Sequence, residues 1–451
     1  MTKPDGFPAA LPKSDISSAV GFVGLAALIL WVAIARYWAV VAETLGIAGP
    51  RLPMDGPHAA IAGVLVVALP MVLWSVFVDK VHLNATTGID WSLKRSRQQL
   101  RGVTWPKILG LWITWAMLAV YFCLCRWYWD GNYIFAVKLL AISAVAMAVL
   151  CVPYTMWLDR KMIEPRDHAW HFGAMLLRRE GWEMREVKKH WRAWMIKAFF
   201  GAFMLSIVPG NFANVVRADL TEFGSNPVSF AVTMINLLFL IDVMVGTVGY
   251  IVTFRPLDAH IRSGNPFVAG WVAALICYPP LVWGVIGNGM VLSYEHAIAP
   301  WHDWLEGSQP LLWAWAGLLV FLTAVYAWAT FAFGLRFSNL TYRGVVTNGP
   351  YRFTRHPAYV SKNLFWWFGG LPFLVTNGNP VDAIRNAVFL LVVNGIYYWR
   401  ARTEEAHLLA EDPKYREYYD WMGQHGLITA PLTRLALRLR PTGEMISQPA
   451  E

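Results

Sequence analysis

Residues 348–363 read NGPYRFTRHPAYVSKN, and residues 400–419 read RARTEEAHLLAEDPKYREYY. Two apolar segments, residues 364–376 and 383–399, lie between these polar stretches. Because a hairpin of two helices returns the chain to the side where it started, we expect both polar stretches to lie at one membrane surface. Charged groups beside lipid are costly, so their density at this surface indicates a functional site.

Both stretches are rich in ionisable side chains, which include Arg352, Arg355, His356, Tyr359, Glu404 and Glu405. The order Gly349-Pro350-Tyr351, then Arg355-His356-Pro357-Ala358-Tyr359, then Glu404-Glu405 after one hairpin, resembles the signature of the isoprenylcysteine carboxyl methyltransferases. The phospholipid N-methyltransferases share this signature. The resemblance covers residues 339–423 and departs from the family at Ser361, where the family usually has glycine.

This resemblance implies a membrane methyltransferase that uses S-adenosylmethionine. By resemblance, the residues that contact the cofactor are His356, Tyr359, Glu404 and Glu405. Arg355 would serve the cofactor or the local fold. Arg400 and Arg402 lie within about one helical turn of Glu404, so we expect these two arginines to hold the methyl acceptor. Our candidate catalytic residues are therefore Arg355, Arg400 and Arg402, and we expect no metal ion.

The chemistry of methyl transfer explains why such residues are needed. Transfer from a sulfonium is an in-line displacement that requires aligned reactants and the exclusion of water. The amino and hydroxyl groups of the cofactor need carboxylate partners, and its own carboxylate needs cations or N–H donors. A carboxylate acceptor is already ionised at neutral pH and needs no base, whereas an amine acceptor must first lose a proton.

The composition is typical of a polytopic membrane protein. Of the 451 residues, 57% are hydrophobic and only 15% are charged, which excludes an ordinary soluble domain. The net charge of +9 does not indicate nucleic-acid binding, because the basic residues lie mostly in loops between apolar runs. The four cysteines lie inside apolar segments, so we expect them to be free thiols.

We therefore expect an all-α fold, a polytopic transmembrane helical bundle of about ten spans. The expected spans are residues 18–41, 58–77, 108–127, 133–158, 194–216, 228–254, 267–292, 311–335, 364–376 and 383–399. The last two are short, and Pro279-Pro280 should kink the seventh. The expected regions are a cytoplasmic N-terminal segment (1–17), a six-span membrane region (18–254), a methyltransferase-like helical core (267–440) and a disordered tail (441–451).

Basic loops alternate with neutral or acidic ones along the chain. By the positive-inside rule, both termini and the active site should face the cytoplasm. In the cytoplasmic loop 159–192 we expect an amphipathic helix on the inner leaflet. Glu164, His168 and His171 in this loop should be solvated rather than bound to metal, because no fourth ligand is apparent. Asp242, in the middle of a span, either lines a substrate cavity or bonds a neighbouring helix.

The sequence thus predicts an integral-membrane methyltransferase that uses S-adenosylmethionine and acts on a lipidic or isoprenoid-linked acceptor. This amphiphile should reach the site from the inner leaflet, with Trp366 or Trp367 against its tail, and membrane lipids are the other expected partners. Two alternatives are an NADPH-dependent membrane reductase of the sterol or steroid type and a non-enzymatic transporter or scaffold. Ala358 counts against the sterol reductases, which carry asparagine at this place.

Overall fold

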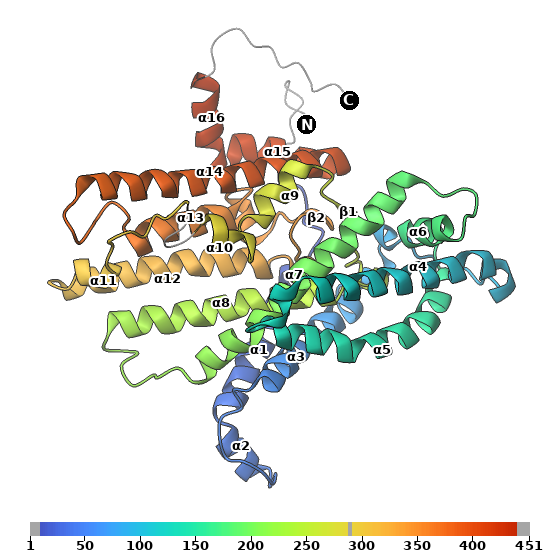
Figure 1. The fold of residues 1–451 in the computed structure, drawn as a ribbon, viewed down its shortest axis with the longest axis horizontal. Coiled ribbons are helices and arrows are strands. Elements are labelled where there is room, and N and C mark those ends of the chain that lie inside the picture. Colours follow the sequence, from blue (N-terminus) through green and yellow to red (C-terminus); the bar gives the residue numbers. More distant parts are fainter. Residues whose placement is uncertain (1–9, 287–290, 440–451) are drawn as a thin grey trace.

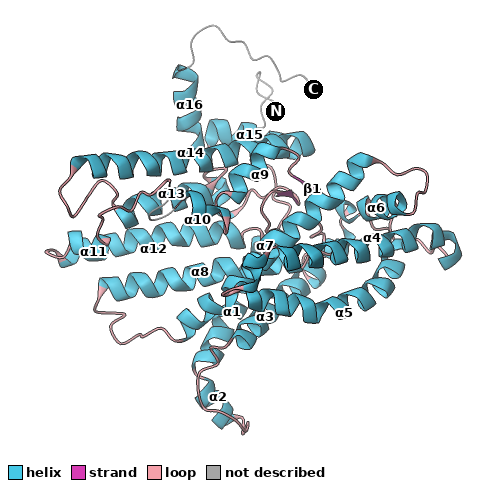
Figure 2. Ribbon diagram, viewed as in Figure 1, coloured by secondary structure: helices cyan, strands magenta, loops and turns pink. Residues whose placement is uncertain are grey.

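The computed structural model describes residues 10–286 and 291–439 of the chain. Most of this part is helical, and strand is almost absent from it (Figures 1 and 2), which confirms the all-α fold class. The helices of the first part are α1 (Ser18–Arg36), α2 (Trp38–Thr44), α3 (Pro57–Phe77), α4 (Arg97–Leu124), α5 (Tyr133–Asp159), α6 (His168–Leu176), α7 (Met184–Val216) and α8 (Pro227–Ile251). Those that follow are α9 (Val268–Leu275), α10 (Leu281–Val285), α11 (Trp301–Trp304), α12 (Gln309–Phe331), α13 (Pro357–Gly370), α14 (Pro380–Glu411), α15 (Pro413–His425) and α16 (Thr429–Leu439). Two short strands, β1 (Ser263–Gly264) and β2 (Thr341–Tyr342), pair antiparallel with Ser263 opposite Tyr342.

Eight helices in the described part of the chain are long and apolar enough to cross a membrane. They are α1, α3, α4, α5, α7, α8, α12 and α14. The polytopic helical bundle is therefore confirmed, and the chain is an integral membrane protein. These eight agree roughly with the expected count of about ten spans. The two further segments, both in the C-terminal part, do not form long apolar helices in the described residues.

The expected span at residues 267–292 is not one helix. Helix α9 ends at Leu275, and the short α10 begins only after Pro279-Pro280. Two successive prolines lack the backbone N–H groups that would continue a helix, so the segment is interrupted rather than kinked. The other short element, α13, has 14 residues. Such a helix is about 21 Å long, which is less than the ~30 Å thickness of the hydrocarbon core.

The expected span at residues 383–399 continues much further than its apolar run. Helix α14 has 32 residues and ends at Glu411. Its polar last turns stay helical partly because oppositely charged residues one turn apart pair with each other. Arg400 Nε lies 3.2 Å from Glu404 Oε1, and Arg402 Nη1 lies 2.8 Å from Glu405 Oε2. Both glutamates of the second motif are therefore carried by one long helix.

The amphipathic helix expected on the stretch MLLRREGWEMREVKKHWRAW, residues 175–194, does not form as a separate surface helix, because the second half of this stretch begins the long helix α7. Helix α6, which precedes it, is buried against α4 and α7. A Cβ at Gly173 of α6 would lie only 1.8 Å from the Pro106 carbonyl oxygen of α4, so only glycine permits this approach. The basic stretch from Met184 onward forms the first turns of α7. No metal-binding cluster of His, Cys, Asp and Glu occurs in the described residues, and His171 Nδ1 instead accepts the Glu183 N–H at 3.0 Å.

The principal core lies between α1, α3, α7 and α8, and α12 joins it. Helices α1 and α12 approach closely at Gly21, where a Cβ atom would lie only 2.3 Å from the Phe331 carbonyl oxygen, so glycine is needed there. Helices α8 and α12 are also joined by Asp242, whose carboxylate accepts hydrogen bonds from Thr330 and, at 3.1 Å, from Tyr326. Of the two alternatives for Asp242, the structure therefore supports a bond to a neighbouring helix.

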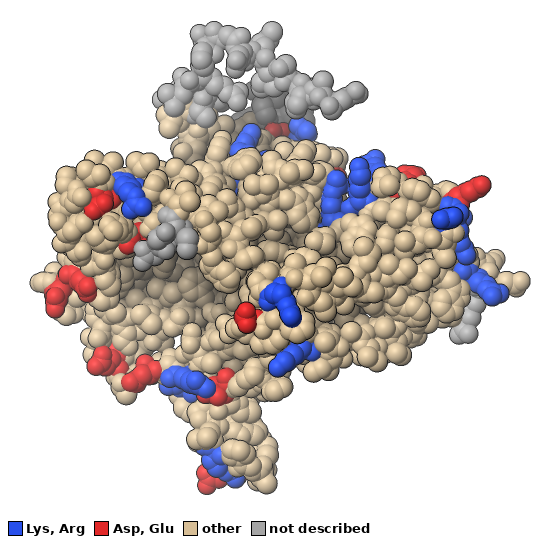
Figure 3. Space-filling view, in the orientation of Figure 1, with Lys and Arg blue, Asp and Glu red and all other residues tan. Residues whose placement is uncertain are grey.

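The start of α1, the end of α3 and the loops after α8 and α12 meet around one cavity, so they lie at the same end of the bundle. On the face shown in Figure 3, charged side chains are sparse over most of the surface, although a few lie in its middle. Many Lys and Arg side chains gather at the end near α4 and α6, and Asp and Glu side chains predominate at the opposite end. The four cysteines are free, as expected. The disordered tail expected at residues 441–451 lies outside the described residues.

Candidate functional site

The first motif stands where the chain turns into α13. Pro357 occupies the first turn of α13, where its missing N–H costs nothing, and His356 is the residue that precedes the helix. The second motif lies in the last turns of the long helix α14. Helices α13 and α14 pack against each other, and the two motifs meet where α13 begins.

Glu405 is the centre of the first group of contacts. Its Oε1 lies 3.1 Å from His356 Nε2 and 2.7 Å from Arg355 Nε, and its Oε2 lies 2.8 Å from Arg402 Nη1. The side chain of Glu405 is only 3% exposed, so three cationic or polar groups compensate one buried carboxylate. The Arg355 Nε–H is not aligned with Glu405, and this buried donor has no hydrogen-bond acceptor in the described residues. The Arg355 guanidinium also stacks 3.9 Å over the ring of Tyr419 from α15.

Glu404 is the centre of the second group of contacts. Its Oε1 accepts a 2.5 Å hydrogen bond from the Tyr359 hydroxyl and a 3.2 Å bond from Arg400 Nε. The ring of Tyr359 stacks on that of His356, with centroids 5.4 Å apart and planes at 5°, so the two groups are adjacent. Arg400 Nη2 in turn donates to Asn339 Oδ1 at 2.6 Å.

All seven residues expected at the site thus lie together: Arg355, His356, Tyr359, Arg400, Arg402, Glu404 and Glu405. Their roles in binding or catalysis stay predictions. Burial separates the two arginines expected to hold the acceptor, because the side chain of Arg400 is 3% exposed and that of Arg402 is 51% exposed. Arg400 is therefore an inner residue of the site, whereas Arg402 covers Glu405 from the surface.

The charges of the site suit a small zwitterion. Both hydrogen bonds that Glu404 accepts end on Oε1, so Oε2 has no partner in the described residues, and the side chain is 21% exposed. That oxygen can accept from an ammonium or a hydroxyl group of a ligand. Three arginines against two glutamates leave an excess of positive charge, which favours a ligand carboxylate at the same site.

Several contributors to the site come from outside the two motifs. Asn339 precedes β2, and its Nδ2 donates to the hydroxyls of Tyr250 at 3.0 Å and Tyr278 at 3.2 Å. The Arg400 guanidinium lies 5.7 Å from the ring centroid of Tyr278. Sequence reasoning missed these three residues, because nothing in their local pattern shows that they meet Arg400. Asn339, the first residue of the stretch 339–423 that resembles the family, was the only signal.

Comparison with protein families finds one match. Residues 315–410 match the model of the isoprenylcysteine carboxyl methyltransferase (ICMT) family. This C-terminal segment is isoprenylcysteine carboxyl methyltransferase-like. The ICMT-like segment runs from within α12 to the end of α14 and covers about a fifth of the chain, including both motifs. No curated protein and no solved structure matches the chain.

The match implies a membrane methyltransferase of the isoprenylcysteine type, and it favours this interpretation over the reductase and transporter alternatives. The resemblance inferred from residues 339–423 is confirmed, although the matching segment starts earlier and ends before Gly423. The remaining four-fifths of the chain, including α1 to α8, has no counterpart in the family match.

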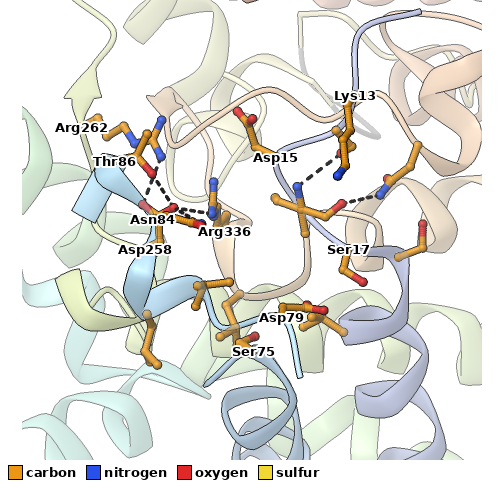
Figure 4. A pocket seen from close by; sticks show the side chains of 18 of the residues that line it. Lys13, Asp15, Ser17, Ser75, Asp79, Asn84, Thr86, Asp258, Arg262 and Arg336 are labelled. Atoms are coloured by element: carbon orange, nitrogen blue, oxygen red, sulfur yellow. Dashed lines mark hydrogen bonds and ion pairs between the residues drawn. The ribbon is translucent and has the colours of Figure 1, made fainter. Parts of the chain in front are cut away.

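A polar cavity of 760 Å³ lies where the N-terminal region meets the ICMT-like segment (Figure 4). The N-terminal segment, the end of α3 and the loops after α8 and α12 all contribute lining residues, which include Asp15, Ser75, Asp79, Asp258, Arg336 and Lys414. Burial disfavours the charged form of Asp15, but Lys414 and the Val345 N–H outweigh this effect and lower the Asp15 pKa. None of the seven expected site residues lines this cavity.

Asp258 connects the walls of this cavity. It is 1% exposed, and its carboxylate accepts from Asn84 at 3.1 Å and Thr86 at 2.6 Å, which belong to the loop after α3. On the other side it accepts from Arg262 at 3.1 Å and Arg336 at 2.8 Å. One buried carboxylate therefore ties the N-terminal region to the loop that leads into the motifs (Figure 4).

Proposed function

We propose that the protein is an S-adenosylmethionine-dependent methyltransferase that methylates a lipidic or isoprenoid-linked acceptor within the membrane. The observation that carries this proposal is the joining of two distant motifs, His356 to Glu405 and Tyr359 to Glu404, inside the segment that matches the ICMT family. A belt of charges at the membrane surface would be largely exposed. Here the side chains of Glu405 and Glu404 are only 3% and 21% exposed, and both bond to residues at the start of α13.

The residues of the site have complementary tasks in this proposal. When bound, the cofactor supplies an electrophilic methyl group on a sulfonium, and the electron pair of the broken C–S bond stays on sulfur. Glu404 Oε2 accepts hydrogen bonds from the amino or hydroxyl groups of the cofactor, and Tyr359 and Arg400 hold Glu404 in place. Arg355 and His356 would donate hydrogen bonds to the carboxylate of the cofactor, and Glu405 holds both of these side chains in position.

Water must be kept from the reacting groups, and the architecture provides for this. Arg400, the inner arginine, is buried and lies against the rings of Tyr278 and Tyr359. Helix α15 covers the outer side through Tyr419, which contacts both Arg355 and Arg402. A site closed on these two sides strengthens the electrostatic interactions inside it.

We further propose that the site and both termini face the cytoplasm. The alternation of basic loops supports this orientation, as does the gathering of Lys and Arg at one end of the bundle (Figure 3). An acceptor with an apolar tail would then approach from the inner leaflet. The short α13 and the interrupted α9–α10 segment are the places where the helical wall is least regular.

Transfer of a labelled methyl group tests this function. Purified protein is mixed with S-adenosylmethionine carrying a radioactive methyl group and with a lipid extract of the host membrane, and the organic phase is then counted and separated. We expect label in a lipid or prenylated product with wild-type protein and with Glu417→Gln, an exposed glutamate of α15. Loss of label with Glu404→Gln would support the proposal. The absence of label with wild-type protein, across extracts and a prenylcysteine acceptor, would refute it.

A further inference from the structure

Lys362 lies in an unusual setting one turn beyond Tyr359 on α13. Its ammonium Nζ lies 5.7 Å from the ring centroid of Tyr326, 5.2 Å from that of Trp366 and 5.5 Å from that of Tyr397. These rings belong to α12, α13 and α14, so the ammonium stands where three helices of the ICMT-like segment meet. Aromatic faces stabilise a cation by a modest amount, but they do not neutralise its charge.

The ammonium has no anionic partner. Lys362 makes no hydrogen bond or ion pair with any residue in 10–286 or 291–439, and its partly buried Nζ is not sealed from the surface. The nearest acid in the helical wall, Asp242, already accepts bonds from Thr330 and Tyr326 and lies beyond ion-pair distance. An unpaired cation within a helical membrane bundle is costly, so its presence points to an anion that joins it.

Lys362 also lies between the expected cofactor residues and a cavity that could hold the tail of a methyl acceptor. Tyr359, Lys362 and Trp366 are spaced i, i+3 and i+7, so they share one face of α13. Tyr359 lies on the side of Glu404 and Arg400. Trp366 lines a cavity of 350 Å³ together with Phe365, Gly369 and Gly370 of α13 and Tyr294, which lies between α10 and α11. Cavities of this size accommodate small apolar ligands.

We propose that Lys362 binds the carboxylate of the methyl acceptor and thereby selects anionic amphiphiles. This inference rests on the proposed function and adds the residue of this chain that would recognise the acceptor's charge. The acceptor's charged head lies between Lys362 and the cofactor residues, and its tail extends past Trp366 into the 350 Å³ cavity. Methyl transfer forms a C–O bond at the carboxylate and breaks the C–S bond of the donor, with no proton released. The product ester is neutral, so it loses its attraction to Lys362 and can leave.

The position of Lys362 separates its task from that of the arginines. Arg400 is committed to Glu404 and Asn339, and Arg402 is half exposed above Glu405. The two arginines that the sequence suggested for the acceptor are therefore occupied, whereas the lysine is free. An amine acceptor would be repelled by Lys362 and Arg400, so the structure favours the carboxylate among the acceptors considered.

Binding of two matched amphiphiles tests the proposal. The probes are N-acetyl-S-farnesylcysteine and its carboxamide, which have the same tail and differ by one negative charge. Their dissociation constants are measured by tryptophan fluorescence in detergent, without methyl donor. We expect the wild type to bind the carboxylate about tenfold or more tightly than the carboxamide, because an ion pair is stronger than a neutral contact. Equal affinities of the wild type would overturn the proposal without any variant.

Two variants and a control complete the test. Lys362→Gln should weaken carboxylate binding about tenfold and leave carboxamide binding unchanged, and Lys362→Arg should keep the preference. Lys138→Gln, at an exposed lysine of α5, should behave as wild type. A preference retained in Lys362→Gln would overturn the proposal. If the wild type prefers the carboxylate but transfers no methyl group in the labelling assay, the methyltransferase function is refuted and the anion site is still supported.

Discussion

Replacing Asp258 with asparagine should destabilise the protein strongly, although the change is one of the smallest possible. Asp258 has φ of 49°, a left-handed conformation that asparagine also tolerates. The backbone strain at this position is therefore similar in the wild type and in the variant. What changes is the charge and one set of acceptor positions, so the variant isolates the electrostatic role of this carboxylate.

The expected magnitude follows from its four partners. Oδ2 accepts from Asn84, Thr86 and Arg336, and Oδ1 accepts from Arg262. An asparagine amide must turn its NH₂ toward one of these two sets of donors. Arg336 is 5% exposed and would lose its buried counterion. Removing one partner of a buried ion pair costs on the order of 3–5 kcal/mol, so we expect a loss of this size in unfolding free energy.

Unfolding in detergent, followed by tryptophan fluorescence against denaturant concentration, measures this loss. Asp55→Asn is the matched control, because Asp55 pairs with Arg217 at the surface, with side chains 27% and 65% exposed. An exposed pair contributes less than about 1 kcal/mol. A midpoint for Asp258→Asn equal to that of Asp55→Asn would refute the view that this carboxylate joins the N-terminal region to the ICMT-like segment.

Three further predictions concern the site and its orientation. Glu405→Gln should lower the melting temperature, because Arg355, His356 and Arg402 lose their shared buried carboxylate; a melting temperature equal to that of the Glu417→Gln control would contradict this. Trp366→Ala should raise the KM of the acceptor severalfold and leave the affinity for S-adenosylmethionine unchanged, because Trp366 lines the 350 Å³ cavity; a normal kcat/KM would place the tail elsewhere. In a background without native cysteines, a thiol at exposed Asp303 should react with an impermeant reagent added to intact cells, and one at exposed Arg416 should not. The reverse labelling pattern would invert the topology.

The sequence predicted the helical bundle well where hydrophobicity alone decides. Long apolar runs such as residues 133–158 and 228–254 became α5 and α8 with small changes at their ends. Hydrophobicity failed at residues 267–292, since it counts apolar side chains but not the backbone donors that Pro279-Pro280 lack. It also ended the last span too early, because pairing between charged residues lets α14 continue to Glu411.

The proximity of the two motifs could be predicted, because they flank a helical hairpin. The structure brings His356 to Glu405 and Tyr359 to Glu404, as that hairpin requires. The partners that reach the site from distant elements could not be predicted, since contacts such as Asn339 with Tyr250 depend on how α8 packs against the C-terminal part. Lys362 was visible only as one basic residue among several, and its ring of aromatic partners comes from three helices.

The central claim is that Glu404 and its neighbours bind S-adenosylmethionine, and calorimetry on purified protein tests it most directly. We expect the wild type and Glu417→Gln to bind S-adenosylmethionine with equal affinity and not to bind NADPH. Glu404→Gln should bind about ten- to a hundredfold more weakly, because a charge-assisted hydrogen bond contributes about 1.5–3 kcal/mol. Wild-type protein that does not bind S-adenosylmethionine, or a Glu404→Gln variant that binds it as tightly as the wild type, would contradict the claim.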